Sequence, residues 1–193
     1  IKEDYFEQLD EFGKSSIDTI IGSATKMNQL IDDILAFSMV SQSEMNKDKF
    51  SMNKLVDDVL GILPISQDYP SVSITVAPQM PQAYGDRKMI AQVLQNLLTN
   101  ALKYTRAVEQ PQITIGFKEH QNKGFYFVQD NGIGFDQSHE KRIFRLFNRL
   151  VGDEYEGSGI GLTIAKRIIK KHKGAIEVIS KPGEGSTFLF NLG

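Results

Sequence analysis

The sequence contains no cysteine and carries little net charge, and each feature excludes a class of protein. Without cysteine, the 193 residues form neither disulfides nor cysteine-based zinc sites. The formal net charge of -2 gives no basis for a nucleic-acid-binding surface. No apolar run approaches the roughly 18 residues of a membrane span, and no signal-peptide pattern is present. What is present is a chain with 40% hydrophobic residues, long enough to bury the core of one globular domain with an appended element.

The N-terminal segment predicts one long amphipathic helix over residues 4–40. Its apolar residues recur at steps of three and four, at Ile17, Ile20, Ile21, Ala24, Met27, Ile31 and Ile34. A stripe of this length needs a partner surface. Two partners remain open: the core of the same domain, or the other helices of a hairpin or dimeric bundle. The polar stretch "SQSEMNKD" then breaks the periodicity, and we place a domain boundary there, between residues 1–45 and 46–193.

Strand-like and helix-like patterns alternate irregularly in the rest of the chain. They predict a short strand at 50–52, helices at 52–63, 86–105 and about 159–172, and strands at 71–77, 112–120, 124–130, 175–180 and 186–192. The lack of regular strand–helix alternation favours the α+β class, with one layer of helices over a mixed sheet. The first residue is Ile1 rather than methionine, and we expect the chain to be part of a longer protein.

Two glycine clusters are candidates for a nucleotide site. They are "DNGIGF" at 130–135 and "GSGIGL" at 157–162. The second lacks the lysine of a P-loop, and its G-x-G-x-G spacing does not match a dinucleotide-binding fingerprint. Taken alone, each cluster is more often a turn than a phosphate site.

The helix "QVLQNLLTNALKYT" places two carboxamides on one face, because Asn96 and Asn100 are four residues apart. Amide oxygens can ligate a hard cation such as Mg²⁺ while leaving its charge for phosphates to neutralise. The alternative is that both residues belong to the solvated face of an ordinary amphipathic helix.

Four segments resemble, in order and spacing, the N, G1, F and G2 boxes of sensor histidine kinases. They are "QVLQNLLTNALKYT", "DNGIGF", "IFRLFNRL" and "GSGIGLTIAKRI". Such boxes define the catalytic ATP-binding domain of the GHKL superfamily, so the resemblance implies its two-layer α/β sandwich, the Bergerat fold, from about residue 50 onward. In addition, "MNQLIDDILAFSMV" resembles the second helix of the dimerisation and phosphotransfer hairpin. The stretch "RIFRLFNRLVGDEYEGSGIGL" is most similar to phytochrome-like light- and redox-sensor kinases.

The resemblance implies a Mg-ATP site and assigns roles within it. Asn100 matches the Mg²⁺-coordinating asparagine, and Asn96 lies one turn earlier at the metal–phosphate side. Lys103 is implied to approach the phosphates and Tyr104 to pack near the adenine or ribose. Asp130 matches the carboxylate that accepts a hydrogen bond from the adenine amino group, a contact that discriminates strongly between bases.

The glycines have implied roles as well. Gly132 and Gly134 are expected to let the backbone pass close to the purine. Gly157, Gly159 and Gly161 are expected to shape a lid hinge and the phosphate-binding start of a helix, where free N–H groups favour anions.

Four further residues complete the implied set. Leu162 belongs to the ATP-binding residues, and Thr187 matches a position near the adenine. Phe144 and Phe147 match the F box, which anchors a mobile lid; that both are ordinary core aromatics remains an equal alternative.

Two departures from related patterns bear on the chemistry. Gyrase-like relatives carry a glutamate at the position of Asn96, and asparagine is no general base, so efficient ATP hydrolysis is disfavoured. The only histidines are His120, His139 and His172. None lies in the N-terminal helix or has the surroundings of a phosphoacceptor, so we expect that the acceptor precedes this sequence and that the chain alone is not labelled by ATP.

The resemblance implies an ATP-binding catalytic domain that transfers the γ-phosphoryl group to an upstream histidine and thence to an aspartate of a response regulator. It also implies ATP and Mg²⁺ as cofactors, a homodimer through the hairpin helices, no nucleic-acid partner and a cytoplasmic module, with membrane contact only through unseen regions. Two alternatives remain: another GHKL ATPase or serine-directed kinase, or a non-catalytic nucleotide-binding dimerisation module.

Overall fold

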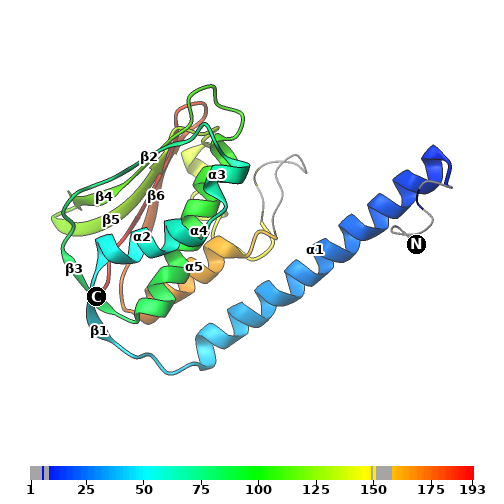
Figure 1. The fold of residues 1–193 in the computed structure, drawn as a ribbon. Coiled ribbons are helices and arrows are strands. Elements are labelled where there is room, and N and C mark those ends of the chain that lie inside the picture. The colour runs from blue at the N-terminus through cyan, green and yellow to red at the C-terminus, as the bar shows by residue number, and fades with distance from the viewer. Residues whose placement is uncertain (1–5, 7–8, 149, 151–157) are drawn as a thin grey trace.

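The N-terminal apolar pattern folds into α1, one helix over Glu11–Gln42. The computed structural model describes residue 6, residues 9–148, residue 150 and residues 158–193. The predicted helix start at residue 4 therefore lies outside the described residues. The helix begins at Glu11 because Asp10 is extended and its carboxylate accepts the N–H of Gly13 at 2.7 Å. Figure 1 shows α1 extending away from a layered α/β body.

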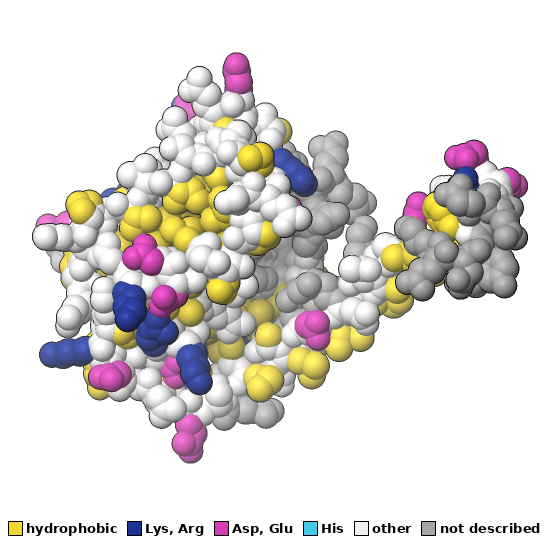
Figure 2. All heavy atoms as spheres, viewed as in Figure 1, with side chains coloured by type: hydrophobic (Ala, Val, Ile, Leu, Met, Phe, Trp, Pro, Cys, Tyr) yellow, Lys and Arg dark blue, Asp and Glu magenta, His cyan; other side chains and the backbone are white. Residues whose placement is uncertain are grey.

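The apolar stripe of α1 is largely exposed, and only its C-terminal end packs on the body. Figure 2 shows hydrophobic side chains along this helix, and the exposed ones include Ile20, Met27, Ile31, Leu35 and Met39. Near the end of α1, Val40 is buried and the guanidinium of Arg167 lies 4.1 Å from the ring centroid of Phe37.

The body begins with β1 (Asp48–Ser51) and α2 (Met52–Ile62), so Met52 starts a helix rather than ending the predicted strand at 50–52. Ser51 ends the strand because its hydroxyl accepts the N–H of Lys54 as a helix cap. The other elements are α3 (Ile65–Asp68), β2 (Ser73–Val76), β3 (Gln82–Gly85), α4 (Arg87–Thr105), β4 (Gln112–His120), β5 (Lys123–Asp130), the short 3₁₀ helix η2 (Gln137–His139), α5 (Gly161–Lys171), β6 (Ile176–Lys181) and β7 (Gly185–Phe190).

Among the described residues, five strands form one mixed sheet in the order β2-β4-β5-β7-β6. β2 runs parallel to β4, and the other neighbours are antiparallel. β1 and β3 form a separate antiparallel pair. The prediction of an α+β sandwich, with helices over a mixed sheet, is confirmed.

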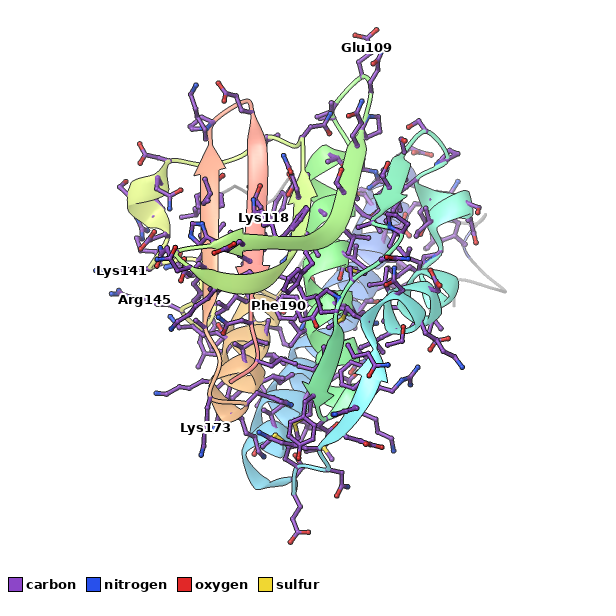
Figure 3. All side chains as sticks on the ribbon, turned by 90° about the vertical axis from the view of Figure 1, so that its left-hand side faces the viewer. Glu109, Lys118, Lys141, Arg145, Lys173 and Phe190 are labelled. Atoms are coloured by element: carbon purple, nitrogen blue, oxygen red, sulfur yellow. The ribbon has the colours of Figure 1, made fainter. Side chains whose placement is uncertain are left out.

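The core lies between the sheet and the helices α2, α4 and α5, which cover one face (Figure 1). The helices contribute Ile90, Val93, Leu94, Leu97, Leu98, Ile164 and Ile168, and the sheet contributes Ile113, Ile115, Val128, Phe188 and Phe190. Figure 3 looks onto the sheet from the side opposite the helices, where Lys118 on β4 lies over the ring of Phe127. None of the described helices combines the length and the apolar character needed to cross a membrane.

Candidate functional site

Helix α4 brings Asn96 and Asn100 to one half-buried side, one turn apart. The helix is fixed at its start by Asp86, whose carboxylate accepts the N–H groups of Lys88 and Met89 at 3.0 and 3.1 Å. The Nδ2 atom of Asn96 is buried and has no hydrogen-bond partner among the described residues. An unpaired buried donor is costly, so Asn96 does not belong to a solvated helix face.

The first turn of α5 lies directly against Asn96. A Cβ atom added to Gly161 would come within 3.2 Å of Oδ1 of Asn96, which shows how closely the two approach. Ile160 precedes the helix and provides no side-chain cap. Within the described part of the chain, no side chain therefore caps the first N–H groups of α5, which lie at the positive end of the helix dipole and close to the side chain of Asn96. This arrangement can bind an anion such as a phosphate group.

Asp130 ends β5 and is a buried carboxylate, with 5% of its surface exposed. Its Oδ1 accepts the N–H of Gly132 at 2.9 Å. Burial raises the pKa of this carboxyl from 3.8 to about 6, against the smaller lowering effect of the N–H groups of Gly132 and Ser186. The carboxylate can accept a hydrogen bond from a base amino group in a sheltered environment.

Neighbouring protein atoms leave no room for a side chain at the two glycines that follow Asp130. A Cβ at Gly132 would lie 2.6 Å from the carbonyl oxygen of Tyr104, and the next residue, Ile133, donates its N–H to that oxygen at 3.2 Å. Gly134 has a φ of +57° and would place a Cβ 2.0 Å from the carbonyl oxygen of Lys181. The segment after β5 is thereby held between the end of α4 and the turn that joins β6 to β7.

The last two strands place Ser186, rather than Thr187, beside Asp130. Ser186 is the register partner of Asp130, and Thr187 is the partner of Gln129. Because side chains alternate along a strand, Thr187 lies on the outer face of the sheet, away from Asp130. The hydroxyl of Ser186 lies on the inner side, 2.9 Å from that of Ser180. Strand alternation in "GSTFLF", where Phe188 and Phe190 share the parity of Ser186, is the sequence signal that could have distinguished the two.

The two F-box phenylalanines differ in environment. Phe144 is buried, and its carbonyl accepts the hydroxyl of Thr163 on α5 at 3.1 Å. Phe147 is 57% exposed, so the alternative that both are core aromatics is wrong for this residue. Its φ of 58° is in the left-handed region. Gly157, the first glycine of the second cluster, lies outside the described residues.

The remaining predicted residues lie around the same end of α4. Lys103 and Tyr104 are half-buried neighbours, with Nζ of Lys103 4.4 Å from the tyrosine ring centroid. Leu162 is half-buried in the first turn of α5 and packs on the core. The structure thus brings Asn96 to Gly161 and Tyr104 to Gly132, whereas it does not bring Thr187 to Asp130.

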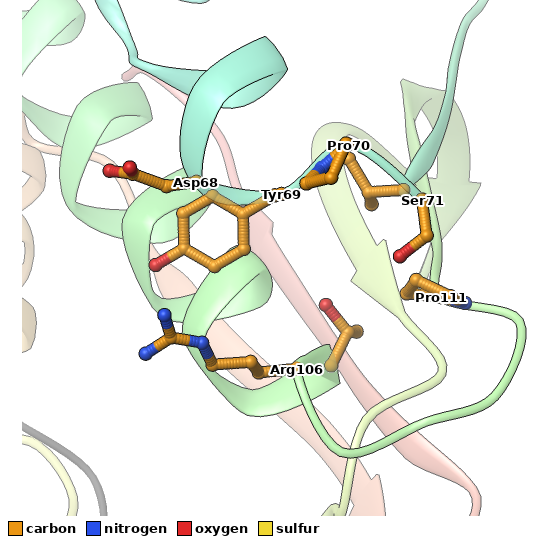
Figure 4. A pocket seen from close by; sticks show the side chains of 8 residues that line it. Asp68, Tyr69, Pro70, Ser71, Arg106 and Pro111 are labelled. Atoms are coloured by element: carbon orange, nitrogen blue, oxygen red, sulfur yellow. The ribbon is translucent and has the colours of Figure 1, made fainter.

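A cavity of about 200 Å³ lies just beyond this end of α4 (Figure 4). It is lined by Asp68, Tyr69, Pro70, Ser71, Val72, Thr105, Arg106 and Pro111. None of the predicted nucleotide-site residues contributes to it. We therefore place the functional site at the convergence of α4, α5 and the end of β5 instead, where the unpaired donor and the buried carboxylate lie.

A metal at this site would depend on amide oxygens. The part of the chain that the structure describes holds no cluster of three or more histidine, cysteine or acidic side chains that could bind a metal ion. Mg²⁺ is commonly bound through few protein oxygens together with water and substrate phosphate. The side-chain oxygens of Asn96 and Asn100 fit that mode and do not fit an all-protein cage.

The chain is similar in sequence to one protein family and to several known proteins. A family model described as histidine kinase-, DNA gyrase B- and HSP90-like ATPase matches residues 85–193. The phytochrome-like protein Cph1 of Synechocystis is 38% identical over 97% of this chain. Cyanobacterial phytochrome B of Nostoc is 37% identical over 100% of the chain. The chain spans only about a quarter of the length of these relatives, 25% and 26% respectively.

Similarity to solved structures supports the same architecture. The full-length structure of ShkA in complex with AMPPNP matches with a TM-score of 0.71 and 23% identity, over 94% of this chain and 39% of the other. At that level of identity the match shows the fold alone.

Proposed function

The chain belongs to the family of histidine kinase-, DNA gyrase B- and HSP90-like ATPases, and from this premise we propose how its residues bind Mg-ATP and direct the γ-phosphoryl group. It is the ATP-binding catalytic domain of a two-component sensor histidine kinase, homologous to the cyanobacterial phytochrome kinases. The observation that carries the proposal is that Asn96, whose Nδ2 is buried and unpaired among the described residues, has its side chain against the start of α5, which Ile160 leaves uncapped.

The adenine is bound at the end of β5, where Asp130 accepts a hydrogen bond from its amino group. Water is largely excluded there, because Asp130 is 5% exposed, so a base without that amino group leaves the carboxylate short of a hydrogen-bond donor and is rejected. The phosphates lie at the start of α5, where Nδ2 of Asn96, the first N–H groups of the helix and the ammonium of Lys103 donate to their oxygens. Asn100 provides an oxygen toward Mg²⁺, which supplies charge neutralisation of the phosphates when bound.

The γ-phosphoryl group is transferred to a histidine nitrogen outside this sequence. The nitrogen forms a bond to the γ-phosphorus while the bond from that phosphorus to the bridging oxygen breaks, and ADP leaves. Asn96 supports transfer over hydrolysis, since a carboxamide cannot take a proton from water. Two of the three histidines are already engaged within the fold, which supports an external acceptor: His172 is fully buried with both ring nitrogens hydrogen-bonded, and His120 lies 3.1 Å from Glu177 on the sheet.

The exposed stripe of α1 provides the surface for a homodimer through hairpin helices in the full protein. Eight large apolar side chains of this helix are exposed: Phe12, Ile20, Ile21, Met27, Ile31, Ile34, Leu35 and Met39. A patch of this kind marks an interaction site. The phosphorylated histidine then passes its phosphoryl group to an aspartate of a response regulator receiver domain, and the module works in the cytoplasm.

Calorimetry and labelling test this function in two stages. The chain should bind ATP with Mg²⁺, and GTP, which lacks the adenine amino group, should bind at least about tenfold more weakly. With γ-labelled ATP, the chain alone should remain unlabelled, whereas a longer chain that includes the preceding residues should acquire an acid-labile label. Failure to bind ATP, or labelling of His120, His139 or His172, would contradict the proposal.

A further inference from the structure

Asn148 is a second asparagine with an unpaired polar atom. Within the described residues, the buried side-chain atoms without a hydrogen-bond partner are Nδ2 of Asn96 and Oδ1 of Asn148. Folded proteins leave few buried polar atoms unsatisfied, so each calls for a specific reason. For Asn96, the proposed function supplies a phosphate oxygen as the partner of Nδ2. Asn148 is assigned no role by the motifs or by the fold.

The backbone before Asn148 is strained in a way that packing does not explain. Phe147 has a φ of 58°, a conformation that is unfavourable for a bulky residue. Its ring is 57% exposed, so burial of the ring does not offset the strain. The N–H of Asn148 closes the turn by donating to the carbonyl of Arg145 at 3.2 Å. The turn brings the backbone of Asn148 against Gly159.

Asn148 and Asn96 lie against the same short segment. A Cβ added to Gly159 would be 3.2 Å from the carbonyl carbon of Phe147 and 3.3 Å from the nitrogen of Asn148. A Cβ added to Gly161 would be 3.2 Å from Oδ1 of Asn96. Two residues span at most about 7 Å. The backbone of Asn148 and the side chain of Asn96 therefore both lie against this segment at the start of α5, where the proposed function places the phosphates.

The two atoms differ in their chemistry, and this difference separates their roles. Nδ2 of Asn96 is a donor, which suits a phosphate oxygen. Oδ1 of Asn148 is an acceptor, which phosphate oxygens repel unless a cation lies between them. We infer that Asn148 is a further residue on the Mg²⁺ side of the site, with Oδ1 facing the cation that the nucleotide brings or one of its bound waters. This inference rests on the proposed function, because it needs a nucleotide at the start of α5.

Calorimetric titration with ADP, with Mg²⁺ and with EDTA, measures the role of this oxygen. In Asn148→Ala, the gain in affinity that Mg²⁺ gives should fall about tenfold, whereas affinity in EDTA should be unchanged. Asn148→Asp keeps an oxygen ligand and should retain the Mg²⁺-dependent gain. Asn46→Ala is the matched control, since Asn46 is exposed after α1 and it is its backbone N–H that donates to Asp86, a bond that alanine keeps. This control should match the wild type in both conditions.

Nuclear magnetic resonance gives a readout that does not depend on affinity. The side-chain amide signals of Asn148, assigned by their loss in Asn148→Asp, should broaden when Mn²⁺ replaces Mg²⁺ in the ADP complex. Those of Asn46 should stay sharp. Broadening supports the position of Asn148 beside the cation, and its absence overturns that position.

The remaining outcomes separate this inference from its rivals. Equal loss of ADP affinity with Mg²⁺ and with EDTA in Asn148→Ala would show a structural role, as would an Asn148→Asp variant no better than alanine. A double-mutant cycle of Asn96→Ala and Asn148→Ala on unfolding without nucleotide tests whether the two amides pair with each other, and coupling there overturns the inference. If the wild type binds nucleotide but Asn148→Ala shows the full Mg²⁺-dependent gain, this inference alone fails. If the wild type binds none, the proposed function fails and the inference with it.

Discussion

His172 accepts the backbone N–H of Asp86 at its Nε2 atom across 2.9 Å, and this bond joins the end of α5 to the start of α4. The imidazole is fully buried, and its Nδ1 donates to the carbonyl of Ile168 at 2.8 Å. Gly85 makes room for the ring, since a Cβ there would lie 2.9 Å from Cδ2 of His172. The two helices that carry the proposed phosphate site are thus held together at the ends opposite that site.

Replacing His172 should weaken the fold markedly. In His172→Ala, the N–H of Asp86 loses its acceptor and a cavity replaces the ring, so we expect a loss of about 3 kcal/mol in unfolding free energy. His172→Gln places an oxygen near the former Nε2 position and should recover part of that loss. Urea unfolding of the two variants beside the wild type measures the difference. A loss below about 1 kcal/mol in the alanine variant would show that the bond between Asp86 and His172 contributes little.

Gly134 should tolerate no side chain, because a Cβ there would clash with the backbone. A second glycine with a similar φ but open space separates this clash from the effect of backbone conformation. Gly134→Ala combines a φ of +57° with a Cβ 2.0 Å from the carbonyl oxygen of Lys181, and we expect a loss above about 4 kcal/mol. Gly183 has a similar φ of +77° but open space around its Cβ position. Gly183→Ala should therefore lose only about 1 kcal/mol. Thermal unfolding of both variants makes the comparison, and equal losses would mean that the backbone conformation alone decides.

The strongly periodic parts of the sequence predicted their structure well, and the short elements did not. The helix expected at 86–105 is α4 at Arg87–Thr105, because nine buried positions on one face fix it and Asp86 caps it. β3 at Gln82–Gly85 was not predicted, since four residues after Pro81 give no alternation long enough to recognise and its partner is β1, far away in sequence.

Site residues that belong to a sequence motif could be predicted, whereas those defined only by their position in the fold could not. Asn96 could be singled out from helix spacing, and Asp130 from the resemblance of "DNGIGF" to the G1 box. The alternation in "GSTFLF" could have set Ser186 on the inner face, but its position opposite Asp130 needed the strand register. Asn148 could not be found from sequence, because neither an unpaired buried oxygen nor the left-handed turn before it leaves a pattern in the residues.

Lys171 should hold α1 against the body. Its ammonium donates to the carbonyls of Val40 and Ser43, at 2.6 and 2.5 Å, where the helix ends. Lys171→Met keeps the aliphatic stem but removes these bonds and the favourable charge at the helix C-terminus. We expect α1 to take a wider range of positions in this variant.

Distances between two spin labels measure this range, and the chain contains no cysteine that would interfere. Labels at Asn28→Cys on α1 and Ser66→Cys on α3, both exposed sites, should show a broader distance distribution with Lys171→Met. The control is Lys170→Met, at an exposed neighbouring position of α5. Identical distributions in all three proteins would mean that the packing of Val40 and Phe37 is sufficient.

The buried carboxylate of Asp130 should lower the unfolding free energy at neutral pH. Its pKa is about 6 in the folded chain, against 3.8 ordinarily, so between these values the folded state binds more protons than the unfolded state. Unfolding free energy therefore falls as pH rises from about 4 to 6 and stays lower above it, by up to about 3 kcal/mol. Asp130→Asn removes the buried charge and should recover much of the lost unfolding free energy at pH 8. Its unfolding free energy should also depend less on pH below pH 6.

The same substitution should weaken nucleotide binding, because a neutral carboxamide in place of the Asp130 carboxylate no longer offers a charged acceptor to the adenine amino group. We expect wild-type ATP affinity to decline as pH falls below about 6, as Asp130 becomes protonated, and to be low and less pH-dependent in Asp130→Asn. Unfolding experiments and calorimetric ATP titrations from pH 5 to pH 8 test the predictions for stability and for ATP affinity. A variant that is less stable at pH 8, or that binds ATP as tightly as the wild type, would show that the buried carboxylate is retained for the fold and not for the base.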